Sequence, residues 1–166
     1  HLQRLAQDAV DKVRRDEVRE QRGTDEGRAL KKTRWALLKR PWNVNVEENR
    51  KLAQVQRTNR RLYRAYLLKE TLADILDRRQ PNVAKELLAD WMAWAQRCRL
   101  EPFRKLGRTI ARHIGGIVEY VRTRLSNAIS EGMNSKIRTA TKQAYGFRDS
   151  SSLTGVIYLR CSGVEI

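Results

Sequence analysis

The side chains best suited to binding a charged ligand lie in a short arginine-rich segment. Residues 50–64 include six Lys or Arg residues and no acidic residue. Four of them have the i, i+3, i+4, i+7 spacing of one helix face: Arg57, Arg60, Arg61 and Arg64. Because a guanidinium group donates two parallel hydrogen bonds to a phosphate, this face is a candidate contact for a nucleic-acid backbone. The alternative is a solvated basic face whose aliphatic stems cover apolar surface.

The other candidate is a carboxylate within a basic stretch, Glu131. It falls in the first turns of a helix expected over residues 129–144, with Arg124 before it and Lys136 after it. A negative charge at that place stabilises a helix by up to about 1 kcal/mol and needs no further role. One carboxylate holds Mg²⁺ poorly, because phosphoryl-transfer sites use several oxygen ligands to position two ions. The spacing alone leaves both interpretations open.

The composition of the chain narrows the class of protein. Its 166 residues are enough for one ordinary domain, and 35 Lys or Arg against 19 Asp or Glu give a formal net charge of +16. Two cysteines cannot crosslink a small secreted fold, and their spacing matches no zinc pattern. No apolar run approaches the roughly 18 residues of a membrane span. These features predict a soluble, intracellular protein with a polyanionic partner, most often a nucleic acid.

The hydrophobic periodicity predicts a mainly α-helical chain. Helices are expected over residues 2–21, 45–79, 82–98, 102–121 and 129–144. The apolar run at residues 33–39 is the best strand candidate, and residues 153–159 fit either a helix or a strand. A loop is expected at residues 23–27, and a kink at the glycine pair 115–116.

The aromatic residues divide between a helical core and the strand candidate. Trp91 and Trp94 lie among leucine and alanine at helix spacing, so both are predicted to be core residues, and so is Cys98. Trp35 and Trp42 flank the strand candidate and are expected to cover its sheet. Stacking of these rings on nucleic-acid bases has no support in the pattern.

Three runs near the carboxyl end of the chain form a recognisable pattern: Ser126-Asn127-Ala128, Glu131-Gly132-Met133-Asn134-Ser135-Lys136-Ile137-Arg138 and Ala144-Tyr145-Gly146-Phe147-Arg148. This pattern resembles the catalytic signature of bacterial DDE transposases of the ISL3 insertion-sequence family. That signature reads approximately N-x-x-x-E-G-x-N-x-K-I/V-K/R, followed some six residues later by A-Y/F-G-F. The amino end is similar to the helix after the family's second catalytic aspartate, and residues 35–39 resemble its next strand. Gln143 departs from the family, which commonly has a basic residue there.

The resemblance implies the carboxyl-terminal part of an RNase-H-like α/β domain with a helical insertion, in which one or a few strands remain. Residues 1–46 would be the tail of the first half of the core, and residues 47–118 the insertion. Residues 119–166 would return to the core and carry the catalytic-type glutamate. The 166 residues would then be part of a larger domain.

The resemblance also implies a reaction and a site. In this family two aspartates and the glutamate hold two Mg²⁺ (or Mn²⁺) ions, which activate a nucleophile against a DNA phosphodiester. Glu131 matches the third metal ligand, Asn134 would orient it, and Arg138 and Lys142 would meet the DNA backbone. Both aspartates lie upstream in the family, so the isolated chain is expected to be inactive and to bind no metal tightly. The complete protein would work in the bacterial cytoplasm on the nucleoid, as a candidate homodimer.

Two functions from other classes compete with the transposase prediction. The chain could be a basic helical module that binds DNA or RNA without chemistry. It could also be a helical interaction domain whose basic faces meet an acidic protein. A steep dependence of affinity on salt distinguishes phosphate contacts from the last of these.

Overall fold

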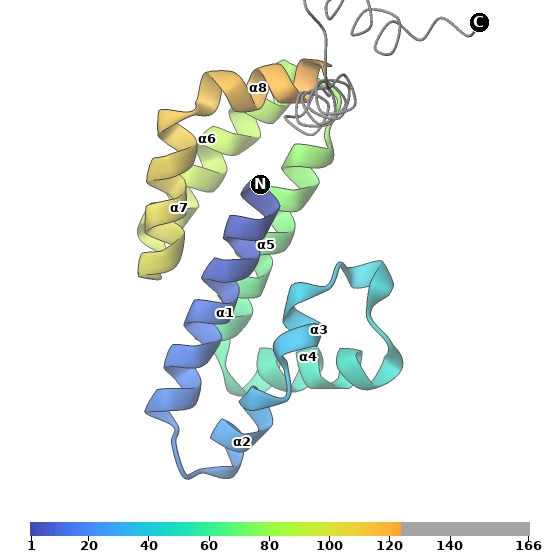
Figure 1. Cartoon of the computed structure of the whole chain (residues 1–166), viewed down its shortest axis with the longest axis vertical. Helices are drawn as coiled ribbons and strands as arrows, with labels where there is room; N and C mark the ends of the chain where they lie inside the picture. Colours follow the sequence, from blue (N-terminus) through green and yellow to red (C-terminus); the bar gives the residue numbers. More distant parts are fainter. Residues whose placement is uncertain (124–166) are drawn as a thin grey trace, which may run out of the picture. The chain divides into compact units, whose positions relative to one another are not determined.

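The computed structural model describes residues 1–123, and every regular element within them is a helix (Figure 1). The elements are α1 (Leu2–Glu20), α2 (Asp25–Lys31), α3 (Arg34–Leu38), the 3₁₀ turn η1 (Pro41–Asn43), α4 (Val46–Thr58), α5 (Arg60–Asp77), α6 (Pro81–Arg97), α7 (Glu101–Arg112) and α8 (Ile114–Thr123). The prediction of a mainly α-helical chain is confirmed. The expected elements at residues 129–144 and 153–159 lie outside the described residues.

The strand expected at residues 33–39 is wrong, because this run forms the short helix α3. The backbone N–H of Leu37 donates to the carbonyl of Thr33, and that of Lys39 donates to Trp35. The neighbouring residues Ala36 and Leu37 are both buried, which a helix end packed into a core allows and an alternating strand does not. Trp35 and Trp42 are 63% and 70% exposed, so neither covers a sheet.

Two long helices expected from the sequence are each broken in the structure. The helix expected over residues 45–79 ends at Thr58 and restarts at Arg60, because Asn59 leaves the helical region with φ −136° and ψ 83°. The helix expected over residues 102–121 breaks at His113, before the glycine pair at which a kink was expected.

Two of three local end signals act where the sequence placed them. α4 starts with a complete capping box, in which Asn45 and Glu48 bond each other's backbone N–H groups. Pro102 lies in the first turn of α7, where its missing N–H costs nothing. α6 begins at Pro81 with Gln80 before it, so Asn82, the expected cap, is already inside the helix.

The core forms where α1, α5, α6 and α7 pack together. α1 and α5 run side by side in opposite directions (Figure 1). α6 packs against α5, and α7 packs against both α6 and α1. Trp91 is 2% exposed, its indole N–H donates to the Leu68 carbonyl at 2.8 Å, and its ring lies 6.5 Å from that of Phe103. The predicted core positions of Trp91 and Cys98 are confirmed, while Trp94 is half-buried at the core's edge.

Residues before and after residue 46 share this one core, since α1 packs on α5 and α7. The expected segment boundaries at residues 46 and 118 stay predictions. Among the described helices, none is both long and apolar enough to cross a membrane.

Candidate nucleic-acid interface

The junction between α4 and α5 positions the predicted arginines. The Oδ1 atom of Asn59 accepts the backbone N–H of Leu62 at 2.8 Å and so caps α5. The Nδ2 atom of the same side chain donates to Oε2 of Glu17, on α1, at 2.7 Å. Because Asn59 is 6% exposed, this bend is fixed in the interior of the protein and cannot straighten without breaking both bonds.

Arg61 belongs to the same buried network. Its Nη1 atom lies 3.1 Å from Oε1 of Glu17 and 3.4 Å from Oε1 of Glu20. Glu17 is only 5% exposed, so its charge needs the hydrogen bond from Asn59 and the nearby positive charge of Arg61. Arg61 therefore joins α5 to α1 and is already neutralised within the protein.

The predicted arginine face is not one helix face. Arg57 lies on α4, whereas Arg60, Arg61 and Arg64 lie on α5, beyond the bend at Asn59. Arg57, Arg60 and Arg64 are exposed, and within residues 1–123 none of the three forms an ion pair. The charges that remain available for a ligand are thus presented from two helices that meet at a bend.

A second network attaches α3 and η1 to α5. Lys69 is 3% exposed, and its Nζ atom donates to the carbonyls of Leu37 at 2.7 Å and Lys39 at 3.0 Å, besides pairing with Glu70. Burial lowers the pKa of Lys69, although the carboxylate of Glu70 opposes that effect. The ammonium group thus donates hydrogen bonds to carbonyls at the end of α3, which have no partner within the helix.

Arg40 completes this network. Its guanidinium lies 3.2 Å from Glu70, 2.9 Å from Asp74 and 3.0 Å from Asp77, and 4.4 Å from the ring centre of Trp42. Arg40 thus forms ion pairs with all three of these α5 carboxylates. Over residues 1–123, no group of three His, Cys, Asp or Glu side chains is arranged to hold a metal ion.

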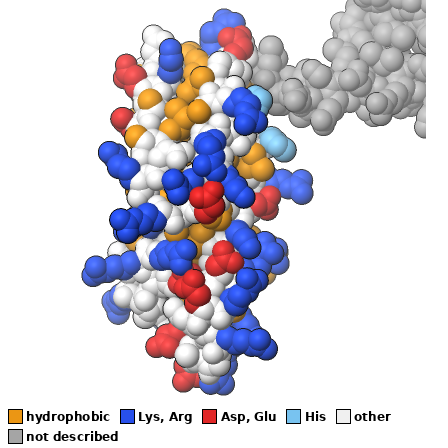
Figure 2. All heavy atoms as spheres, turned by 90° about the vertical axis from the view of Figure 1, so that its left-hand side faces the viewer, with side chains coloured by type: hydrophobic (Ala, Val, Ile, Leu, Met, Phe, Trp, Pro, Cys, Tyr) orange, Lys and Arg blue, Asp and Glu red, His pale blue; other side chains and the backbone are white. Residues whose placement is uncertain are grey.

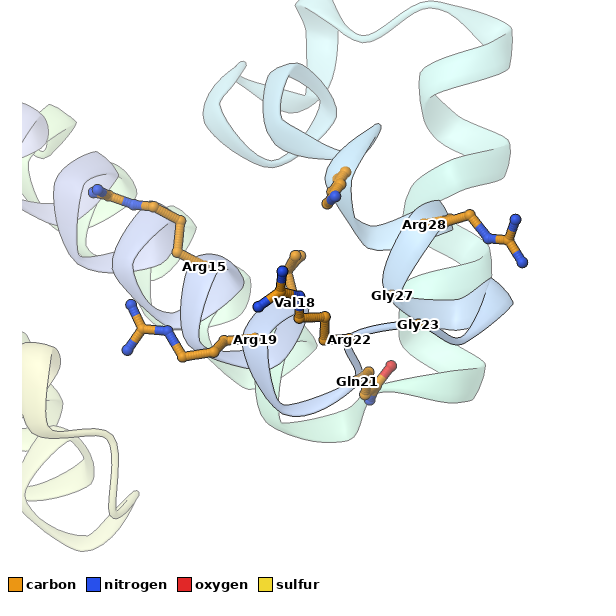
Figure 3. Close-up of a pocket in the computed structure, with 9 residues that line it drawn as sticks. Arg15, Val18, Arg19, Gln21, Arg22, Gly23, Gly27 and Arg28 are labelled. Atoms are coloured by element: carbon orange, nitrogen blue, oxygen red, sulfur yellow. The ribbon is translucent and has the colours of Figure 1, made fainter.

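A basic hollow lies at the corner where α1 turns into α2 (Figure 3). Its volume is about 290 Å³, and no acidic residue lines it. The lining residues are Arg15, Val18, Arg19, Gln21, Arg22, Gly23, Gly27, Arg28 and Lys31. This α1–α2 hollow is lined by five cations, which come from α1, from the turn that follows it and from α2.

Close backbone packing shapes the α1–α2 hollow. A Cβ atom at Gly27 would lie 2.2 Å from the carbonyl oxygen of Gln21, so only glycine lets α2 approach α1 this closely. Thr24 caps α2 by accepting the N–H of Gly27 at 3.1 Å, and its hydroxyl donates to the Gln21 carbonyl at 2.8 Å. The turn itself uses Gly23 at φ +92°.

Sequence reasoning did not find the α1–α2 hollow. Arg15, Arg19 and Arg22 have the i, i+4, i+7 spacing of one helix face, the same signal that identified the arginines near residue 60. Lys31 lies on α2 and joins these arginines only because the chain turns between α1 and α2, which no spacing in the sequence shows. Figure 2 shows that Lys and Arg side chains extend over the whole length of one face of the described unit, with acidic groups between them.

The predicted metal ligand and its neighbours lie outside the described residues. These are Glu131, Asn134, Arg138 and Lys142. Their roles stay predictions from the resemblance.

Comparison with known proteins identifies relatives of one kind. A family model described as a transposase matches residues 1–157. The chain is 38% identical over 141 residues to the transposase for insertion sequence element IS1557 of Mycobacterium tuberculosis, covering 85% of this chain and 32% of that protein. It is 24% identical over 147 residues to the transposase for IS1001 of Bordetella parapertussis, covering 88% of this chain and 36% of that protein. No solved structure shows a significant match.

Proposed function

Because the chain belongs to the ISL3 family of transposases, we propose that it is part of a DNA transposase that cleaves and joins DNA strands by metal-dependent phosphoryl transfer. The observation that carries the proposal is the family match, which extends over residues 1–157 and includes the glutamate signature. The chain spans about a third of the length of its curated relatives. The proposal therefore concerns a protein in which this chain works together with further sequence.

Glu131 is the proposed metal ligand, by its match to the family signature. Two Mg²⁺ or Mn²⁺ ions would supply a nucleophile and stabilise the attacked phosphate, and a single carboxylate cannot position both. The resemblance assigns the remaining ligands to two aspartates that have no counterpart in these 166 residues. Asn134 would orient Glu131. The 166-residue chain alone is expected to show no strand transfer.

The DNA backbone is the proposed partner of the exposed arginines. Arg57, Arg60 and Arg64 have no acidic partner within the described residues, so a phosphate can pair with each of them. Arg61 is not proposed to contact DNA, because its charge is already paired with Glu17 and Glu20. Arg138 and Lys142 are proposed to add backbone contacts. None of these contacts selects a DNA sequence.

The test is the variant Glu131→Gln in a transposase of this family that carries both aspartates together with this chain. It should abolish DNA cleavage and strand transfer while DNA binding persists, because the amide keeps the size of the side chain and loses the charge that holds a metal. The control is Glu119→Gln, which removes a carboxylate of α8 that pairs with Arg122. The control should cleave normally. Normal cleavage by Glu131→Gln would refute the proposed role.

A basic helical module that binds DNA without chemistry is the second candidate. It is favoured by the described unit itself, which presents arginines on a helical framework. The same pair of variants separates the two functions, since equal DNA binding and equal cleavage by Glu131→Gln and the control would favour the module. As part of the transposase function, we also propose that the complete protein forms a homodimer and works on the bacterial nucleoid.

A further inference from the structure

We propose that the α1–α2 hollow binds a phosphate group of the DNA backbone. The inference takes its partner, DNA, from the proposed function and adds a site that lies on different helices from the arginines near residue 60. It rests on the charges that line the hollow, on its size and on the packing that holds its walls together.

The central cations of the α1–α2 hollow lack acidic partners. Within the part of the chain that the structure describes, Arg19, Arg22 and Lys31 form no ion pair. Arg15 is partly compensated by Asp11, at 3.1 Å. Cations that line one hollow repel one another, and an anion between them reduces that repulsion. A phosphate bound in the hollow would therefore be favoured by the charges around it.

Arg28 is not part of the proposed site. Figure 3 shows Arg15 and Arg19 reaching out on the same side of α1, whereas Arg28 is directed away from them. Its guanidinium pairs with Asp25 at 2.7 Å. The site thus consists of arginines from the end of α1 and from the turn after it, together with the lysine at the end of α2.

The size and openness of the α1–α2 hollow fit a hydrated phosphodiester. Its volume of about 290 Å³ compares with about 30 Å³ for one water molecule, so a phosphate group and several waters can enter together. Guanidinium groups bind phosphate oxygens in pairs of parallel hydrogen bonds. DNA is favoured over a small phosphorylated molecule because basic side chains continue far beyond a single hollow on the unit's surface (Figure 2).

The experiment measures binding of duplex DNA to the 166-residue chain over a range of salt concentrations. The site variant is Arg19→Gln/Arg22→Gln/Lys31→Gln. The control variant, Lys85→Gln/Lys105→Gln/Arg112→Gln, removes the same charge from exposed cations of α6 and α7 that form no ion pair within residues 1–123. Thermal unfolding of both variants checks that the fold persists, which is expected because all six side chains are exposed.

The site variant should bind DNA at least about tenfold more weakly than the control. Its slope of log affinity against log salt should be shallower by about 2 to 3, since each lost phosphate contact removes about one unit. The single variants Arg19→Gln and Lys31→Gln should each lower the slope by about one. Equal affinity and equal slope in the site variant and the control would overturn the inference and leave the proposed function standing. Absence of DNA binding by the unmodified chain would overturn the inference as well, whereas the proposed function is tested separately, by DNA cleavage in the complete protein that carries Glu131→Gln.

Discussion

The side-chain amide of Asn59 donates a 2.7 Å hydrogen bond to the buried carboxylate of Glu17, 42 residues away in the sequence. The same asparagine caps α5 through its carbonyl oxygen. One residue therefore ends α4 with its backbone, and with its side chain caps α5 and joins it to α1. The directions in which Arg57 and Arg64 are presented depend on this joint.

Replacing Asn59 with alanine should destabilise the protein by about 2 to 4 kcal/mol. The change removes a helix cap, worth about 1 kcal/mol, and leaves a buried carboxylate short of a donor. The control is Asn45→Ala, which removes the exposed cap of α4 and should cost about 1 kcal/mol. Urea unfolding monitored by circular dichroism measures both values. Equal losses in the two variants would show that the bond to Glu17 contributes nothing.

Replacing Lys69 with methionine should cost about 3 kcal/mol of unfolding free energy. The variant keeps the aliphatic stem but strips the donors from the carbonyls of Leu37 and Lys39, and it leaves Glu70 without one of its cations. Lys51→Met breaks a surface pair with Glu47 and should leave the unfolding free energy nearly unchanged. If both variants unfold at the same urea concentration, the buried ammonium does not hold α3 on α5.

Two helical glycines should respond to alanine in opposite directions. In Gly27→Ala the new methyl group meets the carbonyl of Gln21 at 2.2 Å, so α2 must move, and a loss of about 2 kcal/mol is expected. In Gly116→Ala the methyl group enters open space within α8, and stability should rise by up to about 1 kcal/mol. Melting temperatures of the two variants check the signs. A stabilised Gly27→Ala protein would contradict the close packing of α1 and α2.

Tyr66 should make the protein sensitive to alkaline pH. Burial raises the pKa of its phenol from 10.0 to about 12, so the folded form keeps its proton over a range in which the unfolded form loses it. The unfolding free energy should therefore fall as pH rises from 10 to 12, by up to about 2 kcal/mol from this group.

The variant Tyr66→Phe tests this pH dependence, because it keeps the ring and removes the proton. Its unfolding free energy should decline less steeply above pH 10 than that of the unmodified protein. A decline in Tyr66→Phe as steep as in the unmodified protein would refute the assignment.

Much of the local structure followed from signals a few residues long. The apolar spacing of α1 predicted a helix over residues 2–21, and the helix is Leu2–Glu20. The acidic start at Asn45 and the proline at residue 102 predicted helix beginnings that the structure has. In each case the hydrogen bonds and contacts responsible join residues three or four positions apart, so neighbouring residue types are sufficient to predict them.

The failures at residues 33–39, at Asn59 and at Arg61 share a physical cause, which is the distance along the chain to the partner residue. The run at residues 33–39 contains apolar residues compatible with a strand, but the carbonyls at the end of α3 bond to Lys69, about 30 residues later. The break at Asn59 depends on Glu17, and the pairing of Arg61 depends on the same carboxylate. No local pattern contains these partners.

The sequence by itself therefore determined the helical class, the excess of positive charge and, through the glutamate signature, the resemblance to a family. It predicted that arginines would be available for phosphate, because their type and number can be read directly. Only the tertiary structure decided which of them are available. An arginine is neutralised when a distant acid is brought within about 3 to 4 Å of it, as Glu17 is for Arg61. It contributes to a binding site when packing at a residue such as Gly27 brings two helices together.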